Sequence, residues 1–365
     1  MGITKTLILE QFIQEYSTDR PNYEIFRLKL AELLTALIED AGIDIVSIES
    51  RTKTIQSFKE KIQRPEKNYS NPLDQITDLC GIRIITYYTE DIYKIADIIE
   101  SEFAIDEDNS VDKTKITSPD KFGYLSLHYV LKLNKKRNYL IEWKNFKNLK
   151  AEIQIRSILQ HSWAAIDHKL RYKIKKEIPS SLQRKIFRLS ALLELADEEF
   201  LSIKKQTEEL STEIELSIAK GNLDIEFNSI SLKSYLHDNN LTDDIKQKAL
   251  KLGFTSDTED INDPETQEYF LMRLIATLDN SRLNSIRELD NFLNTIFPYI
   301  EGKLKLVKDA FDEISDENIY ANKSDLVLML LVLSEETKID ITDPKLRNLI
   351  QWQPLLDCFD FILKN

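Results

Sequence analysis

The order of apolar and polar positions divides the chain into a mixed first part and a helical second part. Residues 4–41 repeat apolar side chains at helical spacing with an interruption at 17–21, which predicts two amphipathic helices. Alternating, β-branched stretches begin at Ile45 and return in the segments GIRIITYY, FGYLSLHYVLKL, NYLIEW and LKAEIQIR. Each of these stretches predicts a strand. Helical spacing then runs over residues 157–219 with a break at Pro179, and no strand alternation follows it.

Further helices are predicted between and after these strands. One begins at Thr54 and is ended by Pro65, and another covers the segment YKIADIIESEF. Residues 106–121 are polar without a period, which predicts a long loop, and loops of that length in a compact domain are usually functional. Residues 222–365 predict short helices joined by Asp, Asn and Pro turns.

The elements together predict an α+β fold followed by an all-α region. At 365 residues, of which 42% are hydrophobic, the chain is long enough to bury the cores of two domains. We expect residues 1–220 to form the first domain, with its N-terminal helices, and residues 221–365 to form an acidic, all-helical second domain.

Charge is unevenly distributed between these two parts. Residues 201–365 carry 18 Lys and Arg against 31 Asp and Glu, whereas the first 200 residues are balanced. The basic residues of the balanced part gather in 51–67, 132–137 and 169–176, which favours an anionic partner there. A solvated basic face is the alternative interpretation of each cluster.

Composition predicts a cytoplasmic protein that does not enter a membrane. No stretch approaches the roughly 18 uninterrupted apolar residues that a membrane helix needs, and the N-terminus has no basic segment leading into an apolar one. Cys80 and Cys358 each lie in an apolar run, far apart in sequence, so we expect buried free thiols and a reducing compartment.

A first group of polar residues surrounds the start of the helix predicted after Ile45. Arg51 and Lys53 share one face if they end a strand, while Ser57 and Lys61 share one face of the following helix. Cations that converge at a helix N-terminus suit a triphosphate. A basic face exposed to solvent is the alternative.

A second group lies at the start of the GIRIITYY strand. Asp78 precedes this apolar strand, where a carboxylate is either a turn residue or a metal ligand. Arg83 has the opposite strand parity, so the two side chains share a face only if the chain bends near Gly81. An Arg within an apolar strand also needs a partner, and a structural ion pair is the alternative to a functional role.

A third group lies in the segment KFGYLSLHYV. Tyr124, Ser126 and His128 fall on one strand face. An aromatic ring beside Gly123 at the edge of a loop suits stacking of a base, although a core tyrosine explains the pattern almost as well.

The densest group is AEIQIRSILQHSWAAIDHKLRYK. Glu152, Gln154 and Arg156 share one strand face, and His161 and His168 follow on one side of the next helix. Zinc is the rival interpretation of the histidines, but no third ligand recurs at the usual short spacing and no paired cysteines accompany them.

Taken together, Asp78 and Glu152 with many cations predict phosphoryl-type transfer with Mg²⁺. The sequence has no GxxxxGK[ST], HRD, DFG or GxSxG motif, so it matches neither P-loop enzymes, protein kinases nor serine hydrolases of that type. The residues alone therefore lead to a Mg²⁺-dependent nucleotide enzyme.

Four motifs carry a resemblance to a known family. They are, in chain order, Arg51-x-Lys53-x3-Ser57-x3-Lys61, Asp78-x2-Gly81-Ile82-Arg83, Phe122-Gly123-Tyr124-x-Ser126-x-His128 and Glu152-Ile-Gln154-Ile-Arg156-Ser-x-Leu-Gln160-His161-x-Trp163-Ala164. In this order and spacing they resemble the synthetase domain of the RelA/SpoT alarmone synthetases over about residues 25–200. Ser157 stands where the family more usually has Thr, which leaves the hydroxyl in place.

The resemblance implies a nucleotidyltransferase-like mixed sheet flanked by helices, and transfer of the β,γ-pyrophosphate of ATP to the 3′-OH of GDP or GTP to make (p)ppGpp. It implies that ATP is bound by Arg51, Lys53, Ser57, Lys61 and Arg83, with the two arginines on either side of the adenine. It implies that Mg²⁺ is bound by Asp78 and Glu152, and that Glu152 takes the proton of the attacking hydroxyl. It implies that the acceptor is bound by Lys121, Tyr124, His128 and Gln154, with Tyr124 stacked on the guanine.

Two features limit what the resemblance implies. About 50 residues precede Arg51 and none of them is a histidine, so we expect no alarmone hydrolase and a short, synthetase-only type. Some short relatives are toxins that modify the 3′ CCA end of tRNA, and the basic segments 132–137 and 169–176 suit an acceptor stem, so tRNA is an alternative acceptor. For residues 221–365, a regulatory, protein-binding or self-associating region is weighed against a solvated appendage.

Overall fold

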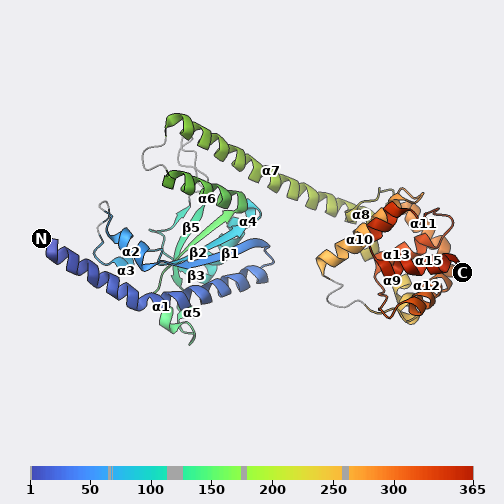
Figure 1. Ribbon diagram of the computed structural model, residues 1–365, viewed down its shortest axis with the longest axis horizontal. Helices are drawn as coiled ribbons and strands as arrows, with labels where there is room; N and C mark the ends of the chain where they lie inside the picture. The colour runs from blue at the N-terminus through green and yellow to red at the C-terminus, as the bar shows by residue number, and fades with distance from the viewer. Residues whose placement is uncertain are drawn as a thin grey trace. The chain divides into compact units, whose positions relative to one another are not determined.

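The computed structural model describes residues 2–64, 67, 69–112, 126–173, 179–256 and 263–364. It contains two compact units, Met1–Lys205 and Gln206–Asn365, each with its own hydrophobic core (Figure 1). The point of division lies within one long helix, α7 (Ser180–Ala219). Among the described residues no helix is both long enough and apolar enough to cross a lipid bilayer.

The first unit is built on a mixed sheet with the strand order β1-β2-β6-β5-β3, and β4 pairs with β5. Only β2 and β6 are parallel, and the other neighbours are antiparallel. The strands are β1 (Ile45–Thr52), β2 (Cys80–Thr86), β3 (Phe103–Ile105), β4 (Val111–Asp112), β5 (Leu127–Leu133) and β6 (Ala151–Ser157). The predicted α+β class with a mixed sheet is confirmed.

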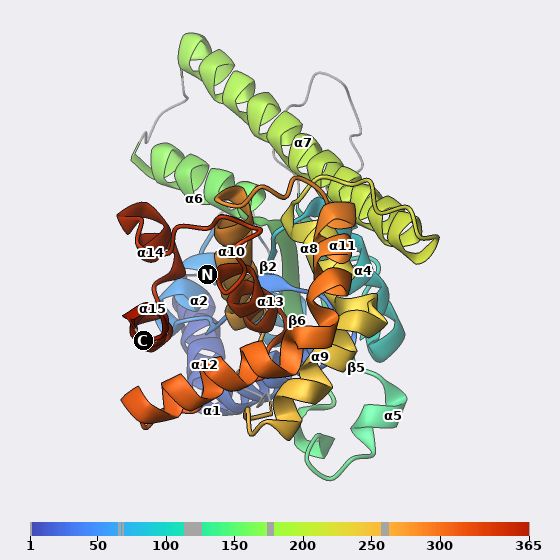
Figure 2. The same ribbon diagram turned by 90° about the vertical axis from the view of Figure 1, so that its right-hand side faces the viewer.

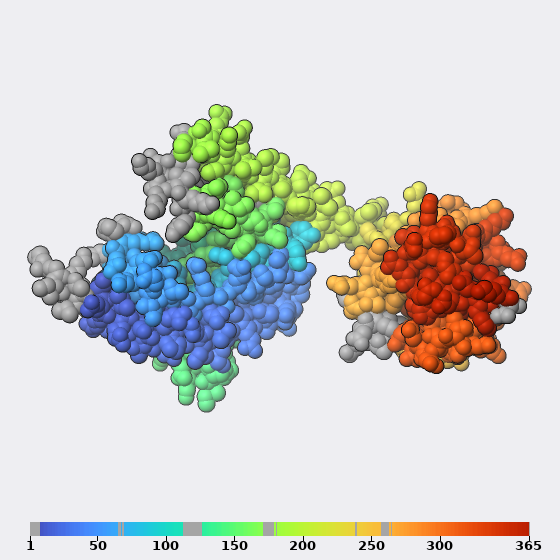
Figure 3. Space-filling model, in the orientation of Figure 1, coloured from blue at the N-terminus to red at the C-terminus, as the bar shows by residue number. Residues whose placement is uncertain are grey.

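The helices of this unit flank the sheet. They are α1 (Gly2–Asp40), α2 (Ile55–Ile62), α3 (Pro72–Gln75), α4 (Thr89–Glu102), α5 (Lys135–Asn138), the 3₁₀ helix η1 (Lys144–Phe146), α6 (Ile158–Lys173) and the first part of α7. Helix α2 begins after Thr54 and the helical stretch breaks at Pro179, as the sequence predicts. In the space-filling view, α1 covers one long side of the unit (Figure 3).

The two faces of the sheet differ in polarity because side chains alternate along each strand. On β6, Ala151, Ile153 and Ile155 are fully buried, whereas Glu152 and Gln154 lie between them on the opposite face. Helices α1 and α4 pack against the apolar face and share its core. The other face is thereby left free for polar side chains.

Helix α1 is continuous, so the predicted break at 17–21 is wrong. Pro21 lies inside the helix, where its missing N–H and its ring cost about 3 kcal/mol. Large side chains keep helical spacing across the proline and are buried on one stripe: Tyr16, Tyr23, Phe26, Leu30, Leu34 and Ile38. Each contributes roughly 1.5–3 kcal/mol when buried, so together they outweigh the local defect.

The strand predicted for the segment NYLIEW is also wrong. Asn138 ends the short helix α5, and residues 139–143 form a series of turns that leads into η1. Trp143 and Phe146 are buried three residues apart, which is the spacing of a helical turn, while Tyr139 and Ile141 are 88% and 78% exposed. The apolar side chains of this segment therefore do not form a strand face: Trp143 packs into the core, whereas Tyr139 and Ile141 face solvent.

The second unit is built from helices, and its described residues, which omit 257–262 and 365, contain no strand (Figure 2). Besides the end of α7, its helices are α8 (Ser229–Asp238), α9 (Asn240–Lys251), α10 (Pro264–Asp279), α11 (Ile286–Ile296), the 3₁₀ helix η2 (Phe297–Tyr299), α12 (Ile300–Ile314), α13 (Lys323–Val332), α14 (Pro344–Ile350) and α15 (Gln353–Lys364). The predicted all-α character of this region is confirmed.

A buried ion pair lies within the core of the second unit. Arg273 Nη2 is 2.8 Å from Asp325 Oδ2, and both side chains are 3% exposed. The guanidinium group also lies 4.8–5.1 Å from the ring centroids of Tyr269, Phe270 and Trp352. Aromatic faces attract a cation, so this arrangement offsets part of the cost of burying the charge.

Candidate active site

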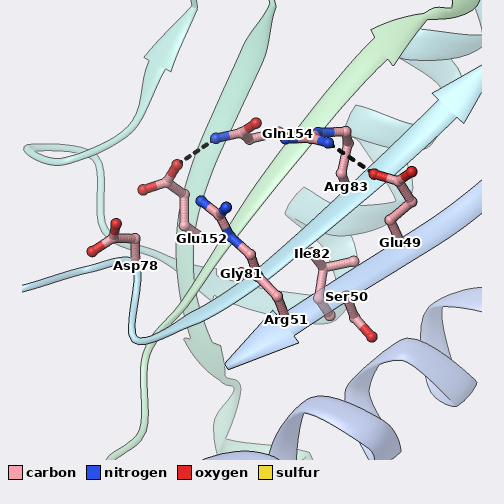
Figure 4. Close-up of a pocket in the computed structure, with 9 residues that line it drawn as sticks. All are labelled: Glu49, Ser50, Arg51, Asp78, Gly81, Ile82, Arg83, Glu152 and Gln154. Atoms are coloured by element: carbon pink, nitrogen blue, oxygen red, sulfur yellow. Dashed lines mark hydrogen bonds and ion pairs between the residues drawn. The ribbon is translucent and has the colours of Figure 1, made fainter. Parts of the chain in front are cut away.

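A pocket of about 170 Å³ opens on the polar face of the sheet (Figure 4). It is lined by Glu49, Ser50, Arg51, Asp78, Gly81, Ile82, Arg83, Glu152 and Gln154. These residues come from β1, the turn before β2, the start of β2, and β6. Segments separated by about 100 residues of sequence therefore meet in one place, and five of the residues predicted for the site are among them.

Strand register places Gly81 between Arg51 on β1 and Glu152 on β6. Gly81 is opposite Arg51 in the β1–β2 ladder and opposite Glu152 in the parallel β2–β6 ladder. A Cβ atom on Gly81 would stand 3.7 Å from Cγ and 3.8 Å from Nε of Arg51, so the arginine side chain lies over the glycine. Because Gly81 has no side chain, Arg51 extends along the floor of the pocket toward β6 (Figure 4).

Asp78 is held by two lysines. Lys53 Nζ lies 2.5 Å from Oδ2, and Lys61 Nζ lies 2.8 Å from Oδ1. Burial by itself would raise the pKa of this carboxyl, but the two hydrogen bonds and the positive charges of the lysines outweigh burial and place the pKa below its ordinary value. Asp78 is therefore a carboxylate at neutral pH.

The start of α2 brings together Lys53, which follows β1, and Lys61 of the helix, both from the first motif. Thr54 is the N-cap residue, and its hydroxyl oxygen accepts a hydrogen bond from Ser57 N at 3.1 Å. Lys61 lies one turn further along and reaches Asp78. The structure thus brings Lys53 and Lys61 to one carboxylate, with Ser57 at the exposed N-terminus of the same helix.

A turn before β2 explains why Asp78 and Arg83 both line the pocket although alternation along a strand would put them on opposite faces. Asp78 lies in a turn before β2 begins at Cys80, so the alternation of the strand does not govern its direction. Arg83 Nη1 donates to Glu49 Oε2 at 2.8 Å, directly across the β1–β2 ladder. This is the partner that the sequence required for the arginine, and both side chains line the pocket.

On β6 and β5 a polar chain leads away from Glu152. Gln154 Nε2 donates to Glu152 Oε1 at 2.7 Å, and His128 Nδ1 lies 3.8 Å from the same oxygen. His128 is opposite Gln154 in the antiparallel β5–β6 ladder, and its Nε2 lies 2.6 Å from Ser126 Oγ. The predicted common face of Ser126 and His128 is consistent with this contact.

Two predicted site residues, Lys121 and Tyr124, lie outside the described residues, between 112 and 126. The predicted contact of the tyrosine with a base stays a prediction.

Two neighbours of the pocket were not among the predicted site residues. Burial, followed by the charge of Arg83, lowers the pKa of Arg156 to about 10. Burial, followed by the charge of Arg83, also lowers the pKa of His161 on α6. Arg156 could have been predicted from the sequence. It lies an even number of residues after Glu152 on β6, and this spacing puts both side chains on the same face of the strand.

The face as a whole has more positive than negative groups. Its cations are Arg51, Lys53, Lys61, Arg83 and Arg156, and its carboxylates are Glu49, Asp78 and Glu152. A chain with a net charge of −13 thus concentrates positive charge at one site. Such a site attracts a polyanion, and its two inner carboxylates, Asp78 and Glu152, supply the oxygen ligands that Mg²⁺ prefers.

The class of protein is defined by a mixed sheet whose polar face carries a pocket lined by arginines and carboxylates. Residues 50–177 match the model of the region found in RelA/SpoT proteins. GTP pyrophosphokinase YwaC of Bacillus subtilis is 31% identical over 163 residues, which are 44% of this chain and 73% of that relative. GTP pyrophosphokinase YjbM of the same organism is 29% identical over 205 residues, 55% of this chain and 90% of the relative. The chain belongs to the RelA/SpoT family.

Solved structures of small alarmone synthetases also match. Small alarmone synthetase 2 of Bacillus subtilis is 25% identical, and the match covers 53% of this chain and 99% of that chain with a TM-score of 0.44. Small alarmone synthetase 1 of the same organism, bound to its product pppGpp, is 24% identical over 54% of this chain and 98% of that chain, with a TM-score of 0.43.

Proposed function

We propose that this chain transfers the β,γ-pyrophosphate of ATP to the 3′-hydroxyl of GDP or GTP, releasing AMP and making (p)ppGpp. The observation that carries the proposal is the meeting of Asp78 and Glu152 in one pocket with Arg51 and Arg83. Family membership supports it, since two relatives are named GTP pyrophosphokinases.

The donor nucleotide fits the part of the pocket lined by β1 and β2, with α2 beside it, since Lys61 of α2 reaches Asp78 in the lining. Lys53 and Lys61 are already directed at one point, the carboxylate of Asp78, and their ammonium groups are free to turn to the phosphates of ATP. The N-terminus of α2 with Ser57 adds N–H donors for the same anion. Arg51 and Arg83 present planar guanidinium groups of the kind that stack on a base.

Mg²⁺ fits the two inner carboxylates. Asp78 and Glu152 come from different elements and line the same pocket, and Mg²⁺ is typically held by one or two carboxylates together with substrate phosphates and water. When bound there, the ion neutralises charge that develops on the transferred phosphates.

The transfer needs a base beside the acceptor hydroxyl, and Glu152 is suited to that role. The 3′-oxygen attacks the β-phosphorus of ATP, the bond between that phosphorus and the α,β-bridging oxygen breaks, and AMP leaves with the bridging oxygen. The proton of the hydroxyl passes to Glu152, whose carboxylate Gln154 holds in place by a hydrogen bond of 2.7 Å. His128, on the neighbouring strand, is placed to orient the acceptor.

The acceptor is tested by competition. Purified full-length protein is incubated with γ-labelled ATP and Mg²⁺ and with GDP, GTP and deacylated tRNA, singly and in pairs. We expect label in the guanine nucleotides and its transfer to tRNA to stay at background. Label in tRNA alone would establish the toxin-type activity instead, and no label in any acceptor would contradict pyrophosphoryl transfer.

We also propose that the synthetase domain extends over residues 1–220 and that residues 221–365 form a separate domain. The separate hydrophobic core of the second unit supports two domains, and the two compact units divide between Lys205 and Gln206, within α7 and before the proposed boundary. Expression of residues 1–220 alone tests it, because a separate domain predicts that the fragment folds and keeps its turnover number within a few-fold of the full chain. Aggregation of the fragment would contradict it.

A further inference from the structure

Three buried nitrogen atoms, on β2, β6 and α6 near the corner between β6 and α6, have no hydrogen-bond partner among the residues that the structure describes. They are Nε of Arg83, Nε of Arg156 and Nδ1 of His161. Buried polar atoms are usually paired, and a group of unpaired ones needs an explanation. Because two of the three belong to guanidinium groups, which only donate, the missing partner must be a hydrogen-bond acceptor.

Positive charge at this corner is compensated only in part. Arg156 is half-buried, and burial together with the nearby charge of Arg83 lowers its pKa to about 10. The nearby carboxylates have other partners, since Glu49 accepts from Arg83 and Glu152 accepts from Gln154. Arg83 thus has a carboxylate partner, but among the described residues Arg156 forms no ion pair, so its half-buried charge suits an anion or a group rich in lone pairs.

We propose that Arg156 is a further substrate-binding residue, which together with Arg83 and His161 forms a cationic subsite for the donor nucleotide, ATP. This assignment rests on the proposed function. It adds a contact at the β6–α6 corner, at the opposite end of the pocket from Asp78. The ring nitrogens of the adenine base are acceptors that would pair with the unpaired nitrogens at this end of the pocket, away from the lysines that we assign to the phosphates.

The surroundings of the corner favour the donor over the acceptor nucleotide. The charged groups that influence His161 are Arg83, Glu49 and Arg156, which come from β2, β1 and β6. Among the described residues, none of these groups comes from β5, whose His128 lies on the side of β6 that we assign to the acceptor. The corner is therefore continuous with the part of the pocket that we assign to ATP.

The test is direct binding of an ATP analogue with a methylene group between the α- and β-phosphates, measured by titration calorimetry with Mg²⁺. The full chain is compared with R156Q, which removes the charge and Nε, and with R156K, which keeps the charge alone. R137Q is the matched control, since Arg137 also has a buried, unpaired Nε but lies on α5 and pairs with Glu102.

We expect R156Q to bind the analogue at least about 10-fold more weakly than the unaltered chain, because a hydrogen bond to a charged group is lost. R156K should fall between the two, and R137Q should bind as the unaltered chain does. The free energy of unfolding of ligand-free R156Q should be unchanged or higher, because a buried like charge is removed. A merely structural Arg156 would instead give a less stable protein.

Three results would overturn the subsite. They are equal binding of the analogue by R156Q, equal weakening by R137Q, and a rise in the KM for GDP without weaker analogue binding. Because binding requires no transfer, the two proposals fail separately. If binding of the analogue depends on Arg156 but the chain forms no AMP from ATP and GDP, the proposed function is contradicted and the subsite stands.

Discussion

The ammonium group of Lys53 lies 2.5 Å from Oδ2 of Asp78, so the residue that follows β1 is tied to the turn that precedes β2. The backbone repeats the connection, since Lys53 N donates to Leu79 O at 2.9 Å. The carboxylate is thereby fixed at the mouth of the pocket before any ligand arrives.

Replacement of Asp78 by Asn should abolish most of the activity. The amide keeps the shape but removes the charge that we assign to Mg²⁺, so we expect pyrophosphoryl transfer to fall at least about 100-fold. The measurement is the initial rate of AMP formation at saturating ATP. Asp74→Asn is the matched control, because Asp74 is exposed in the preceding helix and should leave the rate unchanged. Equal rates for both variants would remove Asp78 from the site.

Asp78 should also contribute to stability in a pH-dependent way. Its pKa in the folded protein lies below the ordinary value of 3.8, so the unfolded chain takes up the proton at a higher pH than the folded one. The stabilisation is therefore complete above pH 3.8 and is lost as the pH falls through the folded-state pKa. Urea unfolding between pH 7 and pH 2.5 should show D78N less stable than the unaltered chain at neutral pH, with a difference that shrinks in acid. A difference independent of pH would contradict the linkage.

Gly81 is expected to tolerate a methyl group but not a long side chain. In Gly81→Ala the new Cβ would stand 3.7–3.9 Å from atoms of Arg51, which is ordinary contact. The variant should be as stable as the unaltered chain or up to about 1 kcal/mol more stable, since its unfolded state has less freedom. Gly81→Leu should displace Arg51 and raise the KM for ATP about 10-fold or more. A normal KM in the leucine variant would show that Arg51 does not depend on the glycine.

The ion pair between Arg273 and Asp325 should be costly to break from one side only. Asp325→Ala leaves a buried guanidinium without its partner, and we expect a loss of about 3–5 kcal/mol in the unfolding of the second unit, measured by circular dichroism in urea. Arg273→Met combined with Asp325→Leu should recover most of that loss. Glu301→Gln, which breaks an exposed pair with Lys248, is the control and should change little. Unchanged stability of Asp325→Ala would show that the aromatic rings alone stabilise the buried charge of Arg273.

Strand parity accounts for the part of the site that could be predicted. Glu152, Gln154 and Arg156 alternate with isoleucines, and period two requires only that β6 be a strand, which it is. Asp78 could be named as a candidate, but the direction of its side chain could not be predicted. Its carboxylate is held by Lys53 and Lys61, which lie 25 and 17 residues before it in the sequence. The unpaired nitrogens at Arg156 and His161 depend on the packing of α6 against β6, which no local pattern encodes.

The two errors in the fold have a common physical origin. Pro21 and the segment 138–143 were interpreted from local preference, and in both cases burial of distant side chains decided the outcome. Tyr16 and Tyr23 are buried on either side of the proline, which keeps α1 in one piece. Trp143 and Phe146 are buried at helical spacing, which excludes a strand. Local propensity is a weak prior when several large side chains reach the core.

The most direct measurement of the central claim is the stoichiometry of products formed by the full chain from ATP and GDP in the presence of Mg²⁺, separated by anion-exchange chromatography. The account predicts one AMP for each ppGpp, and neither product from Glu152→Gln, which keeps the side chain's size but removes the proposed base. Formation of ADP in place of AMP, or an undiminished yield from Glu152→Gln, would contradict it.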